Sequence, residues 1–175
     1  MIFRKYFLKR KIQSILKNSP VRKPRFCSLH EAKTFLISFN IRDKEQIMKC
    51  ADKLAELDKR TIFCVLIPRK PKNAVYDIDP AWLAVREDEL DKQGFPTEDT
   101  RLAFENLKAD VMIDLTRAGD FVMHYLQLLH TGSFKVGTQS FLNKIFDLTV
   151  TRKDRDELSQ FFEHILFYLR TIRSN

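Results

Sequence analysis

Six polar residues follow predicted strands at the places where an α/β protein binds ligands. Asn40 and Arg42 come at the end of one apolar stretch, and Asp114, Thr116 and Arg117 come at the end of another. Ligands of open parallel sheets bind at the carboxyl ends of strands, near the point where the strand order reverses. Two arginines there can bind a phosphate or carboxylate, helped by a helix N-terminus. We therefore predict a candidate anion site formed by Asn40, Arg42, Asp114, Thr116, Arg117 and Thr138.

A structural interpretation of the same residues competes with this site. Asp43 can cap the helix that follows, with Gln46 three residues on as the reciprocal partner. Asp114 can pair with an arginine, and Thr116 can begin a turn. A functional site needs polar groups that converge in space, and sequence cannot show convergence. We favour the structural interpretation on that ground.

Motifs that would name a reaction are absent from the sequence. It contains no GxGxxG, GxxxxGK[ST], GxSxG or HExxH. The four histidines (His30, His124, His130 and His164) have no metal-ligand spacing. Three cysteines form no CxxC, and we expect Cys50 and Cys64 to be buried and inert. We therefore predict no catalytic residue, no metal and no cofactor.

Positive charge is concentrated at the N-terminus. The chain of 175 residues has a net charge of +8, yet residues 1–30 hold nine cations and no acid. Since the whole chain has 31 Lys and Arg, residues 31–175 hold 22 of them against all 23 Asp and Glu. The molecule is thus predicted to be a near-neutral domain with a basic arm. The arm cations are Arg4, Lys5, Lys9, Arg10, Lys11, Lys17, Arg22, Lys23 and Arg25.

The basic arm has several interpretations. It can bind an anionic membrane surface, an acidic partner protein or nucleic acid, or it can be a solvated helix packed on the domain through Phe3, Phe7 and Ile12. Aromatic residues interleaved with cations at Phe3, Tyr6 and Phe7 favour a membrane or RNA surface. Nucleic acid is the less supported of the two, because no RNA-binding motif accompanies them.

Hydrophobic periodicity predicts alternating strands and helices. Predicted strands cover residues 33–40, 61–67, 81–85, 110–115, 133–136 and 147–150. Predicted helices cover residues 2–17, 43–59, 97–108 and 121–129, and a last helix is expected to begin at Thr151, with Asp154 as its third capping position. The last helix has one apolar stripe, formed by Leu158, Phe161, Phe162, Ile165, Leu166, Leu169 and Ile172. Gly132 is expected to stop the helix before it.

This order predicts an α/β fold: a single Rossmann-like or flavodoxin-like three-layer domain with a mostly parallel sheet and an N-terminal basic helical arm. We place the arm and its linker at residues 1–25 and the α/β domain at 26–175. Neither a signal peptide nor a membrane-spanning run is evident, which predicts a cytoplasmic protein. The basic arm adds the expectation of a peripheral position at the inner membrane surface.

Residues 110–137 carry two resemblances. The run DVMIDL, an apolar helix and FKVG, followed by a short strand and an amphipathic helix, resembles a small uncharacterised family of Bacteroidetes proteins with a domain of unknown function. This likeness extends to the basic N-terminal helix and so covers most of the chain. Residues 109–137 also resemble the N-terminal Rossmann half of heptosyltransferase-type GT-B glycosyltransferases. That second likeness implies a related fold.

Together these observations favour a non-catalytic cytoplasmic α/β domain that binds a partner or small ligand and contacts an anionic surface through its arm. Neither ligand nor oligomeric state follows from the sequence. The alternative is a small transferase or hydrolase that uses the anion site at Asn40, Arg42, Asp114 and Arg117. An open pocket at those strand ends would favour the enzyme, and a crevice filled by phenylalanines would favour the binding domain.

Overall fold

A six-stranded, fully parallel sheet forms the centre of the molecule. The structure, a computed structural model, describes residues 2–19, 23, 26–69, 76–138, 143–152 and 157–173. The strands are β1 (Thr34–Asn40), β2 (Arg60–Ile67), β3 (Leu83–Arg86), β4 (Val111–Asp114), β5 (Phe134–Thr138) and β6 (Leu148–Val150), in the order β3-β2-β1-β4-β5-β6. This is the strand order of the Rossmann fold, and it confirms the predicted α/β class.

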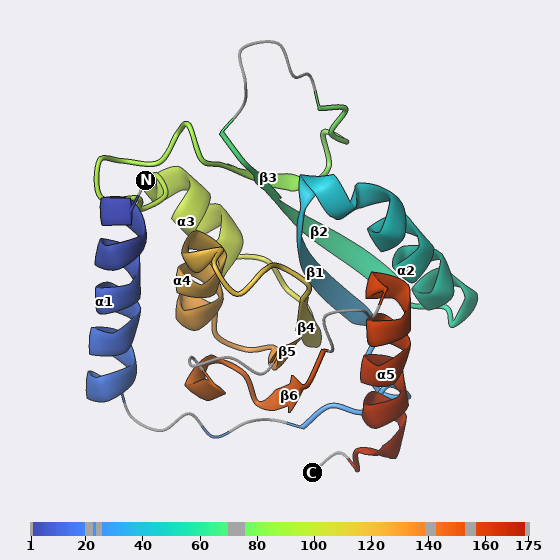
Figure 1. Cartoon of the computed structure of the whole chain (residues 1–175). Coiled ribbons are helices and arrows are strands. Elements are labelled where there is room, and N and C mark those ends of the chain that lie inside the picture. Colours follow the sequence, from blue (N-terminus) through green and yellow to red (C-terminus); the bar gives the residue numbers. More distant parts are fainter. Residues whose placement is uncertain are drawn as a thin grey trace.

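Helices cover both faces of the sheet (Figure 1). They are α1 (Ile2–Asn18), α2 (Lys44–Glu56), α3 (Glu98–Glu105), α4 (Phe121–Leu129) and α5 (Leu158–Thr171), with 3-10 turns η1 (Ile41–Asp43) and η2 (Asn143–Ile145). One face carries α2 and α5, and the other carries α3 and α4, with α1 packed outside α4. The predicted linker prolines, Pro20 and Pro24, lie outside the described residues.

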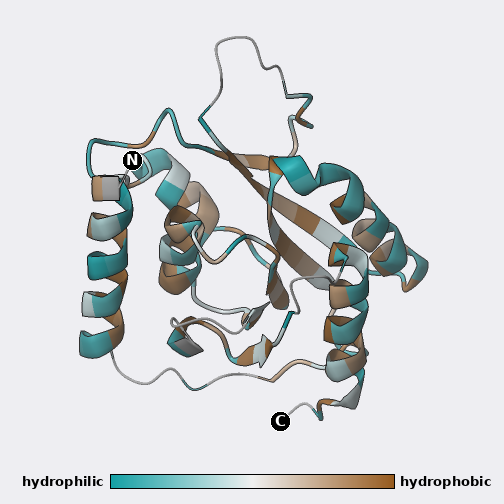
Figure 2. Cartoon of the chain, viewed as in Figure 1, coloured by the Kyte–Doolittle hydropathy of each residue, from teal (hydrophilic) through white to brown (hydrophobic). Residues whose placement is uncertain are grey.

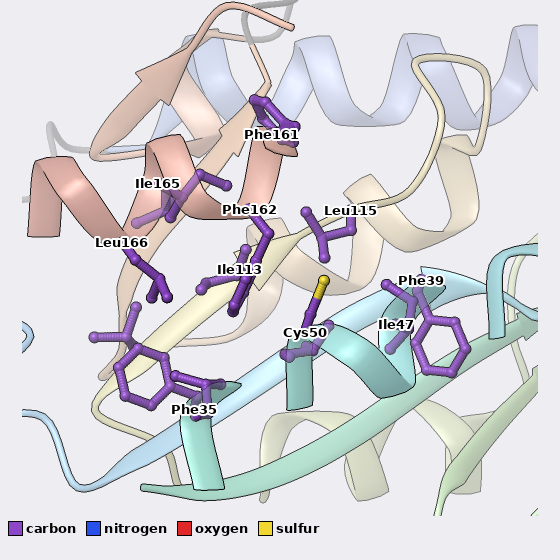
Figure 3. Packing of buried hydrophobic residues seen from close by; sticks show 14 of the residues in the cluster. Phe35, Phe39, Ile47, Cys50, Ile113, Leu115, Phe161, Phe162, Ile165 and Leu166 are labelled. Carbon is purple, nitrogen blue, oxygen red and sulfur yellow. The ribbon is translucent and has the colours of Figure 1, made fainter. Parts of the chain in front are cut away.

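The face under α2 and α5 holds the larger hydrophobic core (Figure 3). Alternate residues of β1, among them Phe35 and Phe39, point to this face, because successive side chains of a strand point to opposite sides. They meet Ile47 and Cys50 of α2 and the stripe of α5, of which Phe162 is fully buried. The predicted stripe on the last helix is therefore confirmed as core.

Helix α1 docks on the opposite face through a narrow apolar edge. Leu8 and Ile12 are 4% and 0% exposed, and Ile12 packs with Ile145 and Phe146. Phe3 and Phe7 remain 78% and 40% exposed, so of the three residues predicted to dock the helix only Ile12 does so. Figure 2 shows mostly hydrophilic residues on the side of α1 turned away from α4.

One predicted helix cap and one predicted helix start differ from the structure. Asp43 makes no capping bond, because turn η1 leads directly into α2 and the Lys44 amide bonds to the Ile41 carbonyl oxygen. Gln46 instead accepts a hydrogen bond from the Leu158 amide at 2.9 Å, so α5 begins at Leu158 rather than after Thr151. The proposed partner Asp154 lies outside the described residues. A contact between two helices, which no local motif encodes, thus marks the start of α5.

Candidate functional site

The carboxyl ends of β1 and β4 lie next to each other, where the chain leaves the sheet toward opposite faces. The two strands are paired, with Ser38 opposite Asp114. After β1 the chain enters α2, and after β4 it enters α4 on the other face. This is the topological switch point at which open α/β sheets bind ligands. The structure therefore brings the polar segments that follow β1 and β4 to the same edge of the sheet.

Asp114 and Thr116 form a closed unit beneath this edge. Asp114 is 0% exposed and Thr116 is 4% exposed. One carboxylate oxygen, Oδ1, accepts hydrogen bonds from the Thr116 hydroxyl at 2.6 Å and the Thr116 amide at 3.0 Å. Thr116 thus folds the loop back on the strand end, as the predicted turn requires.

The second carboxylate oxygen of Asp114 faces a histidine rather than the predicted arginine. His124 Nε2 lies 3.4 Å from Asp114 Oδ2, and the two side chains are 2% and 1% exposed. Burial by itself raises the pKa of Asp114, but the interaction with His124 and the hydrogen bond from Thr116 outweigh it and hold the pKa below its ordinary value. The pair is therefore arranged to keep the carboxylate ionised inside the protein.

Aromatic rings and further polar side chains enclose this pair. Phe121 and Phe146 approach the His124 ring edge to face, with centroids 6.2 and 6.3 Å away. Gly137 admits Phe146, since a Cβ at that position would lie 2.6 Å from the ring. Ser38 Oγ is buried without a hydrogen-bond partner among the described residues. A dissolved substrate has no access to these groups in this conformation.

The remaining predicted residues have separate environments. Asn40 accepts a hydrogen bond from the Arg42 amide at 3.2 Å, which holds turn η1, and the Arg42 side chain is exposed. Arg117 Nη2 lies 3.6 Å from Asp43 Oδ1, a partly exposed pair worth at most about 1 kcal/mol. Thr138 is paired with Val150 at the end of β5. Among the six predicted residues, the hydrogen bond between two side chains that the structure shows is the one between Thr116 and Asp114.

A pocket of about 120 Å³ opens on the α4 side of the same edge. Its walls include Arg4 and Lys5 of α1, Arg69 after β2, and Gly119 and Asp120 before α4. None of the six predicted site residues belongs to this lining. The pocket could not be read from the sequence because it depends on where α1 docks.

His124 was not among the predicted site residues, although a pattern in the sequence pointed to it. Asp120, His124 and Gln127 are spaced four and three residues apart in an otherwise apolar segment. That spacing places three polar groups on one helix face, and the structure buries His124 and Gln127 against the sheet. The strand before this helix ends in an acid, Asp114, and the helix is apolar except for this polar stripe. Such a combination predicts that the acid is buried together with a polar residue of the helix.

The other histidines and the cysteines follow the structural expectation. His30 and His164 are exposed, and His130 Nε2 donates a hydrogen bond of 2.9 Å to the Leu107 carbonyl oxygen. Cys50 and Cys64 are buried, and burial raises the pKa of Cys50 to about 11 and that of Cys64 further still. Both thiols are therefore protonated and unreactive, as predicted. Within the described ranges, no three His, Cys, Asp or Glu side chains are grouped to hold a metal.

The arm cations that the structure describes lie mostly in solvent. Lys5, Lys9, Arg10, Lys11, Lys17 and Lys23 are exposed, and Arg4 is partly buried. Arg22 and Arg25 lie outside the described residues. Among the helices of the described part of the chain, none has the length and apolar character to cross a bilayer.

Comparison with known proteins places the chain in a family. A search of curated proteins and a search of solved structures both found no match, so neither supports the glycosyltransferase likeness. A family model matches residues 4–172, which includes both the basic helix and the α/β sheet. The chain therefore belongs to the family of unknown function DUF6913, in agreement with the resemblance to a domain of unknown function.

Proposed function

We propose that this protein is a non-catalytic cytoplasmic binding domain that contacts an anionic membrane surface through helix α1. The observation that carries the proposal is the outer face of α1. There Phe3 and Tyr6 are 78% and 56% exposed, on the same side of the helix as the exposed cations Arg10 and Lys17. Residues 3, 6, 10 and 17 share one side of a helix, opposite the docked residues Leu8 and Ile12.

The chemistry of this face matches a lipid surface. Helix α1 has no acidic residue, so nothing within it neutralises its cations. Near an anionic leaflet each such charge contributes about 1 kcal/mol, less as salt screens it. Aromatic side chains suit the boundary between headgroups and acyl chains. An acidic protein would also pair with these cations, but the exposed aromatic side chains favour a lipid surface.

The interior of the strand-end region supports binding over catalysis. Among the predicted site residues and their direct partners, Asp114, Thr116 and His124 could do acid–base work, and each is at most 4% exposed. Two aromatic rings cover His124. An enzyme would need a substrate to reach these atoms. The transferase or hydrolase alternative therefore has less support than the surface-binding function.

Vesicle sedimentation tests the proposal. The full chain should bind vesicles of phosphatidylcholine and phosphatidylserine at low salt, release as salt rises, and ignore pure phosphatidylcholine. Replacing Arg10 and Lys17 by Gln should weaken binding on the order of 10- to 30-fold, from about 1 kcal/mol per charge. The matched control replaces exposed Lys49 and Arg170, on α2 and α5, and should bind like the wild type.

Two results would overturn the membrane assignment. Equal losses in both double variants would show that net charge rather than the α1 face drives binding. Salt-resistant capture of an acidic polypeptide with no vesicle binding would identify a protein as the partner.

A further inference from the structure

The pocket between α1 and the strand ends is built from parts of the chain that are far apart in sequence. Its walls come from the first turns of α1, the segments after β2 and β3, and the loop that leads into α4. Its volume of about 120 Å³ is several times the roughly 30 Å³ occupied by one water in the liquid. It is smaller than the roughly 300 Å³ at which pockets enclose a drug-sized ligand. The pocket therefore has room for one compact group.

Three cations from two elements line this space. Arg4 and Lys5 come from α1, and Arg69 follows β2. Arg4 Nη1 donates to the carbonyl oxygen of Glu87 at 3.3 Å, which holds it at the pocket wall. Among the described residues, none of the three forms an ion pair with a carboxylate. Cations gathered around a pocket without acidic partners indicate an anionic ligand.

Lys5 is placed against the loop that begins α4. A Cβ built on Gly119 would lie 3.3 Å from Lys5 Nζ, so the absence of a side chain there lets the ammonium group approach the backbone. The positive end of the α4 dipole begins at the next residues. Asp120, the N-cap residue of α4, offsets part of this positive charge, and Lys5 adds to it. The Lys5 ammonium group and the start of α4 therefore lie together in the wall of the pocket.

The two acids of the lining do not cancel the three cations. Glu87 Oε2 accepts a hydrogen bond from the Arg69 amide at 3.0 Å, and Asp120 Oδ2 accepts one from the Arg117 amide at 3.1 Å. Burial, and to a smaller degree the charge of Asp114, raise the pKa of Asp120. With three cations against two carboxylates, the lining keeps an excess of positive charge.

We propose that this pocket binds a phosphate group, held by Arg4, Lys5 and Arg69 and by the N-terminal end of α4. The rest of the ligand lies outside, because the pocket holds one compact group. Two sources supply such a group: a soluble phosphorylated molecule or a phospholipid headgroup. The site does not depend on the membrane role of α1, because its residues differ from Arg10 and Lys17 on the outer face.

Titration of the full chain with inorganic phosphate, followed by amide NMR shifts, tests the site. Saturable shifts should centre on Gly94 and residues 119–122, which line the pocket. Lys5→Gln and Arg69→Gln should each weaken binding at least tenfold, whereas Lys5→Arg should retain it. Asp120→Asn should tighten binding several-fold, since it removes negative charge from the lining. The control Lys11→Gln removes an exposed charge of α1 that does not line the pocket and should change nothing.

Vesicles of equal surface charge distinguish the two phosphate sources. A preference for phosphatidic acid over phosphatidylserine that is lost in Arg69→Gln would identify the lipid headgroup. Phosphate binding without such a preference would identify a soluble ligand. The Arg10 and Lys17 double variant should weaken vesicle binding and keep phosphate binding, so failure of the membrane role and failure of the pocket give different results.

Other outcomes would overturn the pocket site. They are shifts that never saturate, shifts spread along α1 that are insensitive to Arg69→Gln, or equal weakening by Lys11→Gln. Thermal denaturation of each variant establishes that it is folded before its affinity is compared.

Discussion

Asp114 Oδ2 lies 3.4 Å from His124 Nε2 in a space where both side chains are almost fully buried. The distance suits an ion pair but is longer than an ordinary N–H···O hydrogen bond. The pair joins the end of β4 to the second turn of α4, the two elements beneath the switch point. It therefore fixes the rotation of α4 on the sheet, and with it the position of the loop at residues 117–120.

Asp114→Ala should destabilise the protein by on the order of 3–5 kcal/mol, because it leaves His124 buried without its partner. Chemical denaturation measures the change. Asp52→Ala on the exposed side of α2 is the control and should stay within about 0.5 kcal/mol of the wild type. A variant that unfolds like the wild type would mean that the carboxylate contributes nothing to folding, which would favour the enzyme alternative.

Stability should fall in acid because of the same carboxylate. The pKa of Asp114 in the folded protein is held below its unfolded value of about 3.9, so its contribution is fully present above that pH and is lost as pH falls through the folded pKa. Asp120 acts in the opposite direction, since its folded pKa is raised. Unfolding free energies measured from pH 7 to pH 2 should decline less steeply in Asp114→Asn than in the wild type. Parallel profiles would contradict this assignment.

Phe162→Ala should cost on the order of 3–5 kcal/mol. Phe162 is fully buried between α5 and the sheet, and its removal leaves a cavity lined by core residues. Phe167→Ala on the same helix serves as the control, since Phe167 is 61% exposed. Similar denaturation midpoints for the two variants would show that Phe162 does not belong to the hydrophobic core.

Ile12→Ala should cost on the order of 2–5 kcal/mol, since Ile12 is the fully buried contact of α1 with Ile145 and Phe146. The docking also implies that a chain beginning at Phe26 will lose stability, although the sequence places residues 1–25 outside the α/β domain. Phe3→Ala should leave unfolding unchanged. A truncated chain as stable as the full protein would show that the packing of α1 contributes nothing to the stability of the domain.

Local pattern was sufficient for much of the fold. The continuous apolar run at residues 61–67 and the apolar segment at 121–129 gave elements close to those observed. The burial of Cys50 and Cys64 was predictable because one lies on the apolar face of a helix and the other within an apolar strand. These features were predictable because periodicity and turn chemistry act over a few residues, which a linear pattern records.

Tertiary structure alone decided what surrounds the candidate sites. Leu158 begins α5 because Gln46, 112 residues away, accepts its amide hydrogen bond. Asp114 pairs with His124 rather than with an arginine. The cationic pocket exists because α1 packs next to the strand ends. Sequence fixes which groups are polar or apolar, but their partners depend on how helices rotate and dock on the sheet. That docking is set by the packing of many side chains at once, which no short motif encodes.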